Sequence, residues 1–250
     1  MNDISTSFAP GLFAGKTVWV SGASSGLGLA MARGFALLGA DVIGTGTSAP
    51  KLSAARADAA NAGIRFASVD IRDGAAVTAF AGELPALDVL VNAQGIARPV
   101  AEWDEATFLD VMDVNLNSAF RLAMAAMPQL TRAKGAVVNV ASMLSYLADE
   151  AVPAYTASKT GVVGLTRAMA HRYGVSGVRF NAVAPGYHRT DMTRELWQDP
   201  VAEARIAARS ALKRWGSADD IVGAVIFLCS PAAAFITGVT LPVDGGYHSG

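Results

Sequence analysis

The sequence predicts an α/β fold in which helices cover both faces of one doubly wound, parallel sheet of seven strands. Short runs of β-branched and other apolar residues recur along the chain, and longer segments rich in Ala and Leu separate them. These runs are apolar almost throughout, which is typical of parallel strands that are buried on both faces. No repeat and no linker rich in Pro, Gly or Ser divides the chain, so we expect residues 1–250 to form a single domain.

Seven runs supply the predicted strands, and longer helix-like segments connect most of them. In chain order the runs are "KTVWV" at 16–20, "ADVIGT" at 40–45, "IRFASVD" at 64–70, "LDVLVNA" at 87–93, "GAVVNVAS" at 135–142, "VRFNAVAP" at 178–185 and "TGVTLPVDGG" at 237–246. One polar segment without periodicity, at about 187–216, lies between the sixth run and the last helix-like segment. Its length and its position after a strand predict a cap over a substrate site.

The composition limits the classes of partner. Hydrophobic residues make up 52% of the chain, charged residues make up 16%, and the formal net charge is -1. This charge provides no attraction to nucleic acid or to an anionic membrane, so we expect a small-molecule substrate instead. No run reaches the ~18 apolar residues of a membrane span. Residues 1–16 also lack the basic and apolar regions of a secretory leader, so we expect a cytoplasmic protein.

Neither the cysteine nor the histidines indicate a metal or redox site. Cys229 is the single cysteine, which excludes a disulfide within the chain, and its apolar surroundings in "IVGAVIFLC" predict a packing role. The three histidines, His171, His188 and His248, show no metal-ligand spacing, and no cluster of Cys or carboxylates accompanies them. We therefore expect no bound metal.

A glycine-rich turn follows the first predicted strand. The stretch "SGASSGLGLAMARGFALLGA" places Gly22, Gly26 and Gly28 before a helix of small and apolar residues. Glycines at such a turn let the backbone approach a pyrophosphate, which the free N–H groups and the partial positive charge of the helix N-terminus then hold. A tight turn without a ligand is the alternative. The position after the first strand of an alternating pattern favours dinucleotide binding, although the spacing differs from the common G-x-G-x-x-G.

A second set of polar residues lies near the ends of later predicted strands. Tyr155 and Lys159 are four residues apart, so on a helix their side chains share one face. Ser142 ends the fifth run, Asn115 lies within a long helical segment, and "NAQG" at 92–95 ends the fourth run. The carboxyl ends of strands in a doubly wound sheet are where ligands bind, so these residues are predicted to meet at one edge.

Taken together, these motifs make the chain resemble the short-chain dehydrogenase/reductase family, whose fold is Rossmann-like, over essentially its whole length. The matching pieces, in order, are "SGASSGLG", "NAQG", Asn115, Ser142, "YTASK" and "APG" at 184–186. Two positions depart from the family pattern. Ser21 stands where Thr is usual, and Gln94 stands where a small residue usually precedes Gly95, so the shape or polarity near the nicotinamide is in doubt.

The resemblance implies a role for each candidate catalytic residue. Tyr155 would be the general acid/base, and Lys159 would favour its phenolate form and bond the nicotinamide ribose. Ser142 would orient and polarise the substrate oxygen, and Asn115 would hold a water in a proton relay. The alternatives are an ordinary strand-end hydroxyl for Ser142 and a local backbone bond for Asn115.

The resemblance also implies a set of cofactor contacts. They are Gly22, Ser24, Ser25, Gly26, Leu27, Gly28, Thr47, Asp70, Ile71, Asn92, Ala93, Gly95, Tyr155, Lys159, Pro185, Gly186, His188 and Thr190. Two of them have plain alternatives: Asp70 as a helix N-cap and His188 as a solvated residue of the cap.

The choice between NAD and NADP is set near the end of the second predicted strand. An acidic residue there bonds the ribose 2′-hydroxyl of NAD, and a nearby Arg accommodates the 2′-phosphate of NADP. This chain has Gly46 at the usual acidic position and Ser25 where many NADP-using relatives carry a basic residue. Thr45, Thr47 and Ser48 could bond either group, and Lys51 is the nearby cation. Both NAD and NADP stay open, with NAD weakly favoured.

The nearest resemblance within the family is to sugar-acid and polyol dehydrogenases of the keto-deoxy-gluconate type, through "ASMLSY", "NAVAPGY" and "RWG". For an acidic sugar, Arg98, Arg189 and Arg194 are the candidate partners of the carboxylate. The alternative within the family is a 3-oxoacyl-carrier-protein reductase, for which Arg205, Arg209, Lys213 and Arg214 could form a docking patch.

An alternative of another class is a non-catalytic cofactor-sensing or scaffold protein on the same fold. Such a protein has no reason to keep a phenol, an ammonium, a hydroxyl and an amide together. Long apolar helical segments can bury a second face between subunits, and the family resemblance implies a tetramer, so we expect a homotetramer.

Overall fold

The computed structural model describes residues 4–250. Residues 1–3 belong to the segment in which we expect no leader, and they lie outside the described residues. The seven predicted strands are present and form one parallel sheet in the order β3-β2-β1-β4-β5-β6-β7. They are β1 (Thr17–Ser21), β2 (Asp41–Gly46), β3 (Ile64–Ser68), β4 (Val89–Asn92), β5 (Ala136–Val140), β6 (Arg179–Pro185) and β7 (Thr240–Val243). The sequence prediction of a single α/β domain with a doubly wound parallel sheet is therefore confirmed.

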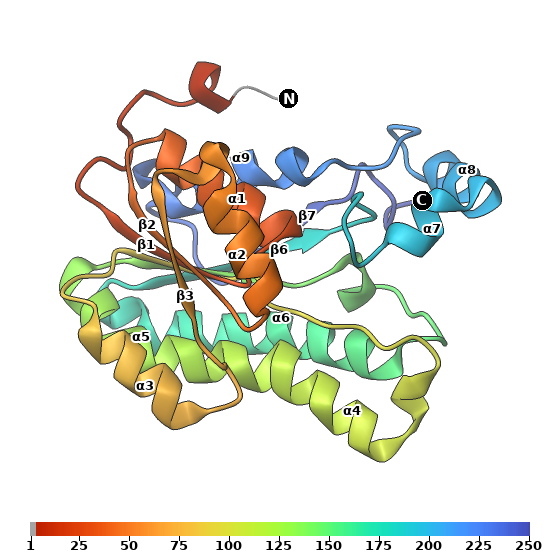
Figure 1. Ribbon diagram of the computed structural model, residues 1–250, viewed down its shortest axis with the longest axis horizontal. Coiled ribbons are helices and arrows are strands. Elements are labelled where there is room, and N and C mark those ends of the chain that lie inside the picture. Colours follow the sequence, from red (N-terminus) through yellow and green to blue (C-terminus); the bar gives the residue numbers. More distant parts are fainter. Residues whose placement is uncertain (1–3) are drawn as a thin grey trace.

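Helices cover both faces of the sheet, as Figure 1 shows. The helices are α1 (Gly26–Leu37), α2 (Ala49–Ala57), α3 (Gly74–Glu83), α4 (Glu105–Met112), α5 (Ser118–Ala133), α6 (Pro153–Tyr173), α7 (Arg194–Gln198), α8 (Pro200–Arg209) and α9 (Val222–Cys229). One apolar core joins the sheet to α1 and α9, and a second core joins the other face to α3, α5 and α6. No helix among residues 4–250 is long and apolar enough to cross a membrane.

The strands are buried because their side chains are apolar on both faces. β4 and β5 contain no exposed residue, and β1 loses exposure after its first residue. Trp19 of β1 is fully buried, and its indole donates a 3.0 Å hydrogen bond to the Thr45 hydroxyl of β2, so the one polar atom of this large side chain is satisfied. Because all strands are parallel, their carboxyl ends lie along one edge.

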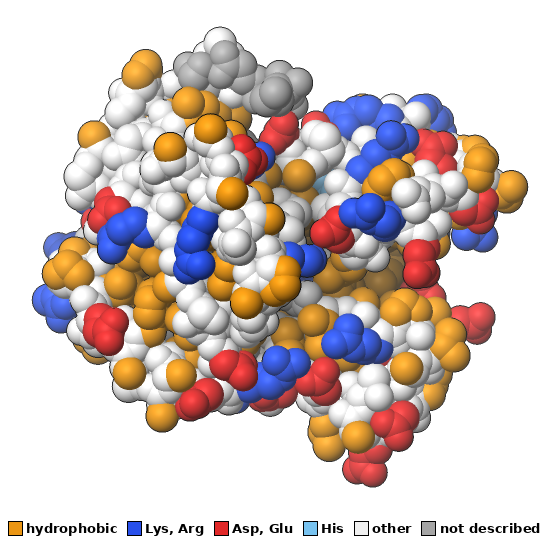
Figure 2. Space-filling view, in the orientation of Figure 1, with side chains coloured by type: hydrophobic (Ala, Val, Ile, Leu, Met, Phe, Trp, Pro, Cys, Tyr) orange, Lys and Arg blue, Asp and Glu red, His pale blue; other side chains and the backbone are white. Residues whose placement is uncertain are grey.

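The predicted cap forms a small lobe beside the main body of the molecule. It contains α7 and α8 and lies to the right in Figure 1. Asp199 caps α8 by accepting a 2.9 Å hydrogen bond from the backbone N–H of Val201, and Pro200 occupies the first helical position. Figure 2 shows a hollow between this lobe and the body below it.

Cys229 lies at the end of α9 against the first core, as its apolar neighbours in the sequence predict. Burial raises the pKa of its thiol to about 12, so the thiol stays protonated and unreactive at neutral pH.

Candidate active site

The glycine turn packs directly against the end of β4. Gly22 has a φ of 80°, and a Cβ there would lie 2.6 Å from the backbone nitrogen of Gln94. A Cβ on Gly28 would lie 2.2 Å from the carbonyl oxygen of Gly22. Neither position can hold a larger residue without moving backbone, so the turn brings the N-terminus of α1 close to the carboxyl edge of the sheet.

A cavity of about 620 Å³ opens at this edge, below the cap. Most of the predicted site residues line it. They are Gly22, Ser24, Ser25, Gly26, Leu27, Gly28, Thr47, Ile71, Ala93, Gly95, Ser142, Tyr155, Lys159, Pro185, Gly186, His188 and Thr190. A volume of this size, lined by residues from positions 21 to 193, suits a dinucleotide and a small substrate side by side.

Three predicted site residues do not line the cavity. Asp70 is exposed, and its carboxylate accepts a 3.0 Å hydrogen bond from the backbone N–H of Arg72. Asn92 is buried, and its amide donates to the Asn139 side chain at 2.8 Å, which ties β4 to β5. Asn115 lies behind the wall of the cavity. The structure therefore places Asp70 in a local turn, while Asp73 is the N-cap of α3, so the alternative of a helix N-cap at Asp70 is wrong. Asn92 makes a buried bond between strands.

Tyr155 lies on the first turn of α6 and Lys159 on the second, and the two side chains share one face. The Lys159 ammonium is 5.7 Å from the centre of the Tyr155 ring and donates a 2.7 Å hydrogen bond to the carbonyl oxygen of Val140. Burial lowers the pKa of Lys159 to about 8, so the ammonium form predominates at neutral pH. Burial is also the main reason why the pKa of the Tyr155 phenol is raised.

The pKa of the phenol is thus raised in the free protein, and the expectation that Lys159 favours the phenolate form stays a prediction. The Ser142 hydroxyl lowers the pKa of Tyr155 through a hydrogen bond, and the Glu102 carboxylate raises it. Desolvation outweighs the hydrogen bond from Ser142, so the phenol is neutral at neutral pH and is a proton donor there.

Ser142 is held in place by the turn that follows β5. Its hydroxyl accepts a 3.1 Å hydrogen bond from the backbone N–H of Leu144, and its own N–H donates to the Ser145 hydroxyl. Ser145 in turn donates a 2.7 Å hydrogen bond to the carbonyl oxygen of Lys159. Ser145 thus connects the two candidate residues, Ser142 and Lys159, although no motif in the sequence marks it.

Asn115 lies in a π-helical stretch (Asp113–Asn117) between α4 and α5, an irregularity that is frequent at functional sites. Its side-chain oxygen accepts from the N–H of Ile96 at 2.8 Å, and its amide donates to the carbonyl oxygen of Ile96 at 2.9 Å. The amide also lies 3.1 Å from the Ser158 hydroxyl. These bonds fix the chain just after Gly95, so Asn115 positions the wall of the cavity next to Lys159.

The residues at the far end of the cavity fit a nicotinamide dinucleotide. Ser25 is the N-cap residue of α1 and makes no side-chain cap bond, which leaves the helix N-terminus facing the cavity. Gly46 cannot take a side chain freely, because a Cβ there would lie 2.9 Å from the Ser24 hydroxyl. Lys51 lies 3.4 Å from the Ser25 hydroxyl and 3.3 Å from the Asp191 carboxylate of the cap. Hydroxyls and one lysine thus replace the acidic residue, an arrangement compatible with NAD and NADP.

His188 is 3% exposed, so it is not a solvated cap residue. Its Nδ1 atom lies 3.1 Å from the carbonyl oxygen of Gly186, and burial lowers the pKa of its imidazole. The ring forms part of the wall between the large cavity and a smaller one of about 270 Å³.

The three candidate arginines differ in their surroundings. Arg189 pairs with Glu203 at 2.8 Å, and Arg194 pairs with Asp191. Only Arg98 lines the cavity. Among residues 4–250 no ion pair engages its guanidinium within 4.0 Å, so this cation is available to a ligand.

Several further residues of the cavity were missed by the sequence reasoning. They are Ser21, Val69, Arg72, Ile96, Ala97, Val114, Val140, Ala141, Asp191, Met192 and Thr193. Most directly flank strand ends or the "NAQG" segment, so proximity to those signals could have found them. Within the described part of the chain no three His, Cys, Asp or Glu side chains are grouped to hold a metal ion.

Comparisons with known proteins cover nearly the whole chain. The family model described as "Enoyl-(Acyl carrier protein) reductase" matches residues 22–248. The chain is 37% identical over 243 residues to 2-dehydro-3-deoxy-D-gluconate 5-dehydrogenase of Escherichia coli, with 93% of this chain and 95% of that protein covered. It is 36% identical over 248 residues to gluconate 5-dehydrogenase of Gluconobacter oxydans, with 95% and 97% covered.

A solved structure shows the same similarity in three dimensions. The crystal structure of a gluconate 5-dehydrogenase from Burkholderia cenocepacia in complex with NADP and tartrate matches with a TM-score of 0.88 and 32% identity, covering 95% of this chain and 97% of that one. The motifs, the sheet order and these matches lead to one conclusion: the chain belongs to the short-chain dehydrogenase/reductase family.

Proposed function

We propose that the protein is an NAD(P)-dependent dehydrogenase that interconverts a secondary alcohol and a ketone on a sugar acid or a polyol. The observation that carries this proposal is that Ser142, Tyr155 and Lys159 share the wall of one cavity with the glycine turn. A hydroxyl, a phenol and an ammonium next to a dinucleotide site are the groups that alcohol oxidation requires. The names of the similar sugar-acid dehydrogenases support the choice of substrate class.

The side chains divide the work on the proton and the substrate oxygen. The Tyr155 phenol donates a proton to a ketone oxygen in reduction and accepts it from the alcohol in oxidation. Because the pKa of this phenol is raised, reduction is supported at neutral pH and oxidation gains as the pH rises. Ser142 orients the substrate oxygen beside the phenol, and Lys159 presents its ammonium to the ribose. The nicotinamide cofactor, when bound, supplies or accepts the hydride.

Asn115 stays a proposed relay residue, although its amide is already engaged by Ile96 and Ser158. The support is stronger for a positioning role, in which Asn115 holds Gly95 and Ile96 against Lys159. The proposed cofactor contacts are the predicted residues that line the cavity, and Asp70 and Asn92 have less support than the others.

A turnover screen tests the substrate class. Purified protein is assayed with gluconate and other sugar acids, with neutral polyols and with β-ketoacyl thioesters, each with NAD(H) and with NADP(H). We expect the highest kcat/KM with an acidic sugar. The weak preference for NAD stays a prediction that the same screen decides. Cofactor binding without turnover of any alcohol or ketone would support the cofactor-sensing alternative instead.

Arg98 is the proposed partner of the substrate carboxylate, because it is the cavity-lining arginine without an ion pair among the described residues. We predict that Arg98→Met raises KM for an acidic sugar by about 10- to 100-fold, since a charge-assisted bond to a carboxylate contributes roughly 1.5–3 kcal/mol. The KM for a neutral polyol should change less than about threefold. Steady-state kinetics with both substrates measure the difference.

Arg189→Met is the matched control, because Arg189 lies outside the cavity lining and already pairs with Glu203. It should leave both KM values close to those of the unchanged protein. Equal effects of Arg98→Met on acidic and neutral substrates would rule out the carboxylate contact.

A 3-oxoacyl-carrier-protein reductase is the second candidate, and the description of the matching family model mentions an acyl carrier protein. The basic patch that would dock such a carrier is partly engaged within the protein. Arg214 pairs with Asp220 at 2.8 Å, and the Arg209 guanidinium lies 4.5 Å from the centre of the Tyr247 ring. Because these side chains already have partners within the protein, the support for a carrier-protein substrate is weaker than the support for a sugar-acid substrate.

We also propose that four copies assemble. Two separate apolar surfaces support this assembly, one formed by Leu109, Phe120 and Met124 on α4 and α5, the other by Phe235 and Leu241 near β7. Two such surfaces suit the two kinds of twofold contact in a tetramer. The mass of the protein in solution tests the assembly.

A further inference from the structure

Glu102 is a fully buried carboxylate that the proposed chemistry does not use. It belongs to a short helical turn (Ala101–Trp103) between β4 and α4, and its exposed fraction is 0%. One carboxylate oxygen accepts a 2.8 Å hydrogen bond from the backbone N–H of Arg98. The other accepts a 2.8 Å hydrogen bond from the backbone N–H of Tyr155. A buried carboxylate costs free energy unless its oxygens are bonded, so this placement needs both amides.

The bond to Tyr155 also caps α6. The N-cap residue of this helix, Val152, has no side chain that can accept a hydrogen bond. Tyr155 is the third residue of α6, and its N–H is one of those that a helix leaves free at its N-terminus. Glu102 supplies the missing acceptor from another part of the chain, and its negative charge is stabilised by the partial positive charge of the helix end.

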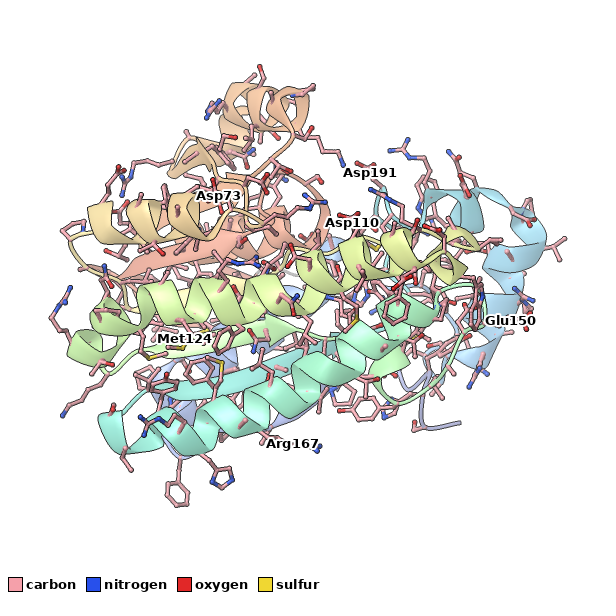
Figure 3. The ribbon with its side chains drawn as sticks, turned by 90° about the horizontal axis from the view of Figure 1, so that it is seen from below. Asp73, Asp110, Met124, Glu150, Arg167 and Asp191 are labelled. Carbon is pink, nitrogen blue, oxygen red and sulfur yellow. The ribbon has the colours of Figure 1, made fainter. Side chains whose placement is uncertain are left out.

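Other bonds hold the same two segments together. The N–H of Val100 donates to the carbonyl oxygen of Ala151 at 2.7 Å, and the indole of Trp103 donates to that of Glu150 at 2.9 Å. Figure 3 labels Glu150 near the end of the molecule where α6 begins. Val100 has a φ of 67°, which is strained for a β-branched residue and persists only where the surroundings determine it. The turn that carries Glu102 is therefore held firmly against the start of α6.

The charged and titratable groups around the phenol are few. Lys159 faces it from the same helix, the Ser142 hydroxyl faces it from the end of β5, and Glu102 acts on it from the turn before α4. Arg98 lines the same cavity. No cation lies within 4.0 Å of Glu102 among residues 4–250, so its charge is not cancelled by a neighbour.

We propose that Glu102 is a positioning residue for the reaction, whose shared carboxylate fixes the backbone of Tyr155 relative to that of Arg98. The inference rests on the proposed function for the roles of these two residues. It assigns Glu102 two separable effects. Its geometry sets the distance between the phenol and the substrate carboxylate contact, and its charge favours the protonated form of the phenol.

Two variants test these effects, and the acidic limb of the pH profile tells them apart. Glu102→Gln removes the charge and, with one oxygen and one NH2 group, can accept from only one of the two amides. The acidic limb of the pH profile of kcat for alcohol oxidation should therefore move to lower pH by roughly half to one pH unit, and kcat/KM should also fall. Glu102→Asp keeps the charge but is too short to reach both amides. It should lower kcat/KM about tenfold or more and leave the limb in place, because small displacements of reacting groups are costly.

Glu105→Gln is the matched control, because Glu105 is exposed and lies three residues further along the chain. It should change neither the rate nor the limb. The assay uses whichever secondary alcohol the unchanged protein oxidises best, so an error in the proposed substrate class leaves this test intact. A protein that oxidises no alcohol at all would contradict the proposed function instead.

The phenol can also be titrated without turnover. The ultraviolet absorbance of tyrosinate is followed in Glu102→Gln and in the same variant carrying Tyr155→Phe, and the difference reports Tyr155 alone. The same difference is measured between the unchanged protein and Tyr155→Phe, both of which keep Glu102. The midpoint of the Tyr155 titration should be lower in the Glu102→Gln background than in this reference pair. The proposal is overturned if Glu102→Gln and Glu102→Asp both retain the rate of the unchanged protein, or if both the limb and the midpoint stay fixed in Glu102→Gln. Loss of the folded state in Glu102→Gln leaves the Glu102→Asp prediction to decide.

Discussion

Tyr155→Phe is expected to lower kcat on the order of a thousandfold while cofactor binding stays within about threefold of its original strength. The substitution removes only the hydroxyl that exchanges the proton, and positioned general acids and bases contribute roughly 10²–10⁴-fold to rates. The ring keeps its packing beside Lys159, and the glycine turn that faces the dinucleotide is untouched. Single-turnover rates and cofactor fluorescence titration measure the two quantities separately.

Tyr173→Phe serves as the control for this experiment. Tyr173 ends the same helix, and its hydroxyl contacts the sulfur of Met124, away from the cavity. The control should turn over at the original rate. If Tyr155→Phe did the same, the proton must pass through another group, and the proposed mechanism would be wrong.

Lys159→Met is expected to weaken both steps, with kcat lower by about a hundredfold and cofactor affinity lower by about tenfold. Its ammonium is buried, donates to the carbonyl oxygen of Val140 and lies close to Gly95, where a Cβ would be 3.4 Å from Nζ. Methionine has a similar shape, so the variant removes mainly the charge and the donors. The tests are kinetics and a cofactor binding isotherm.

Lys16→Met is the matched control, because Lys16 pairs with Asp88 just before β1, at the opposite edge of the sheet. It should affect neither quantity. Unchanged cofactor affinity in Lys159→Met would rule out the proposed contact between the Lys159 ammonium and the ribose. The role of the lysine would then be limited to the phenol.

The sheet could be predicted from the sequence because a parallel strand that is buried on both faces appears as a short, continuous run of apolar residues. Every apolar run became a strand, and the four-residue spacing of Tyr155 and Lys159 correctly placed them on one face of α6. The raised pKa of the free phenol could not be predicted from the sequence, because desolvation depends on what the tertiary structure packs around the ring.

Other features of the site could not be predicted because they depend on contacts between residues that lie far apart in the sequence. Arg98 and Arg189 look alike in the sequence, and the ion pair with Glu203 that distinguishes them forms only when the cap folds. Glu102 stands in "VAEWDE", an ordinary acidic stretch, and gains meaning only because Tyr155 lies 53 positions later on a helix that approaches it. For Asp70 even the local alternative failed, because the cap of α3 is formed three residues later by Asp73.

The buried thiol at the end of α9 makes the protein a convenient host for site-directed probes. The chain has no other cysteine, and a thiol with a pKa of about 12 presents almost no thiolate to maleimides or iodoacetamides at neutral pH. A cysteine introduced on the exposed side of α8 would therefore take a single fluorophore or spin label without prior removal of the native one. The position of the cap lobe relative to the sheet can then be followed while cofactor and substrate are added, with the original core left unaltered.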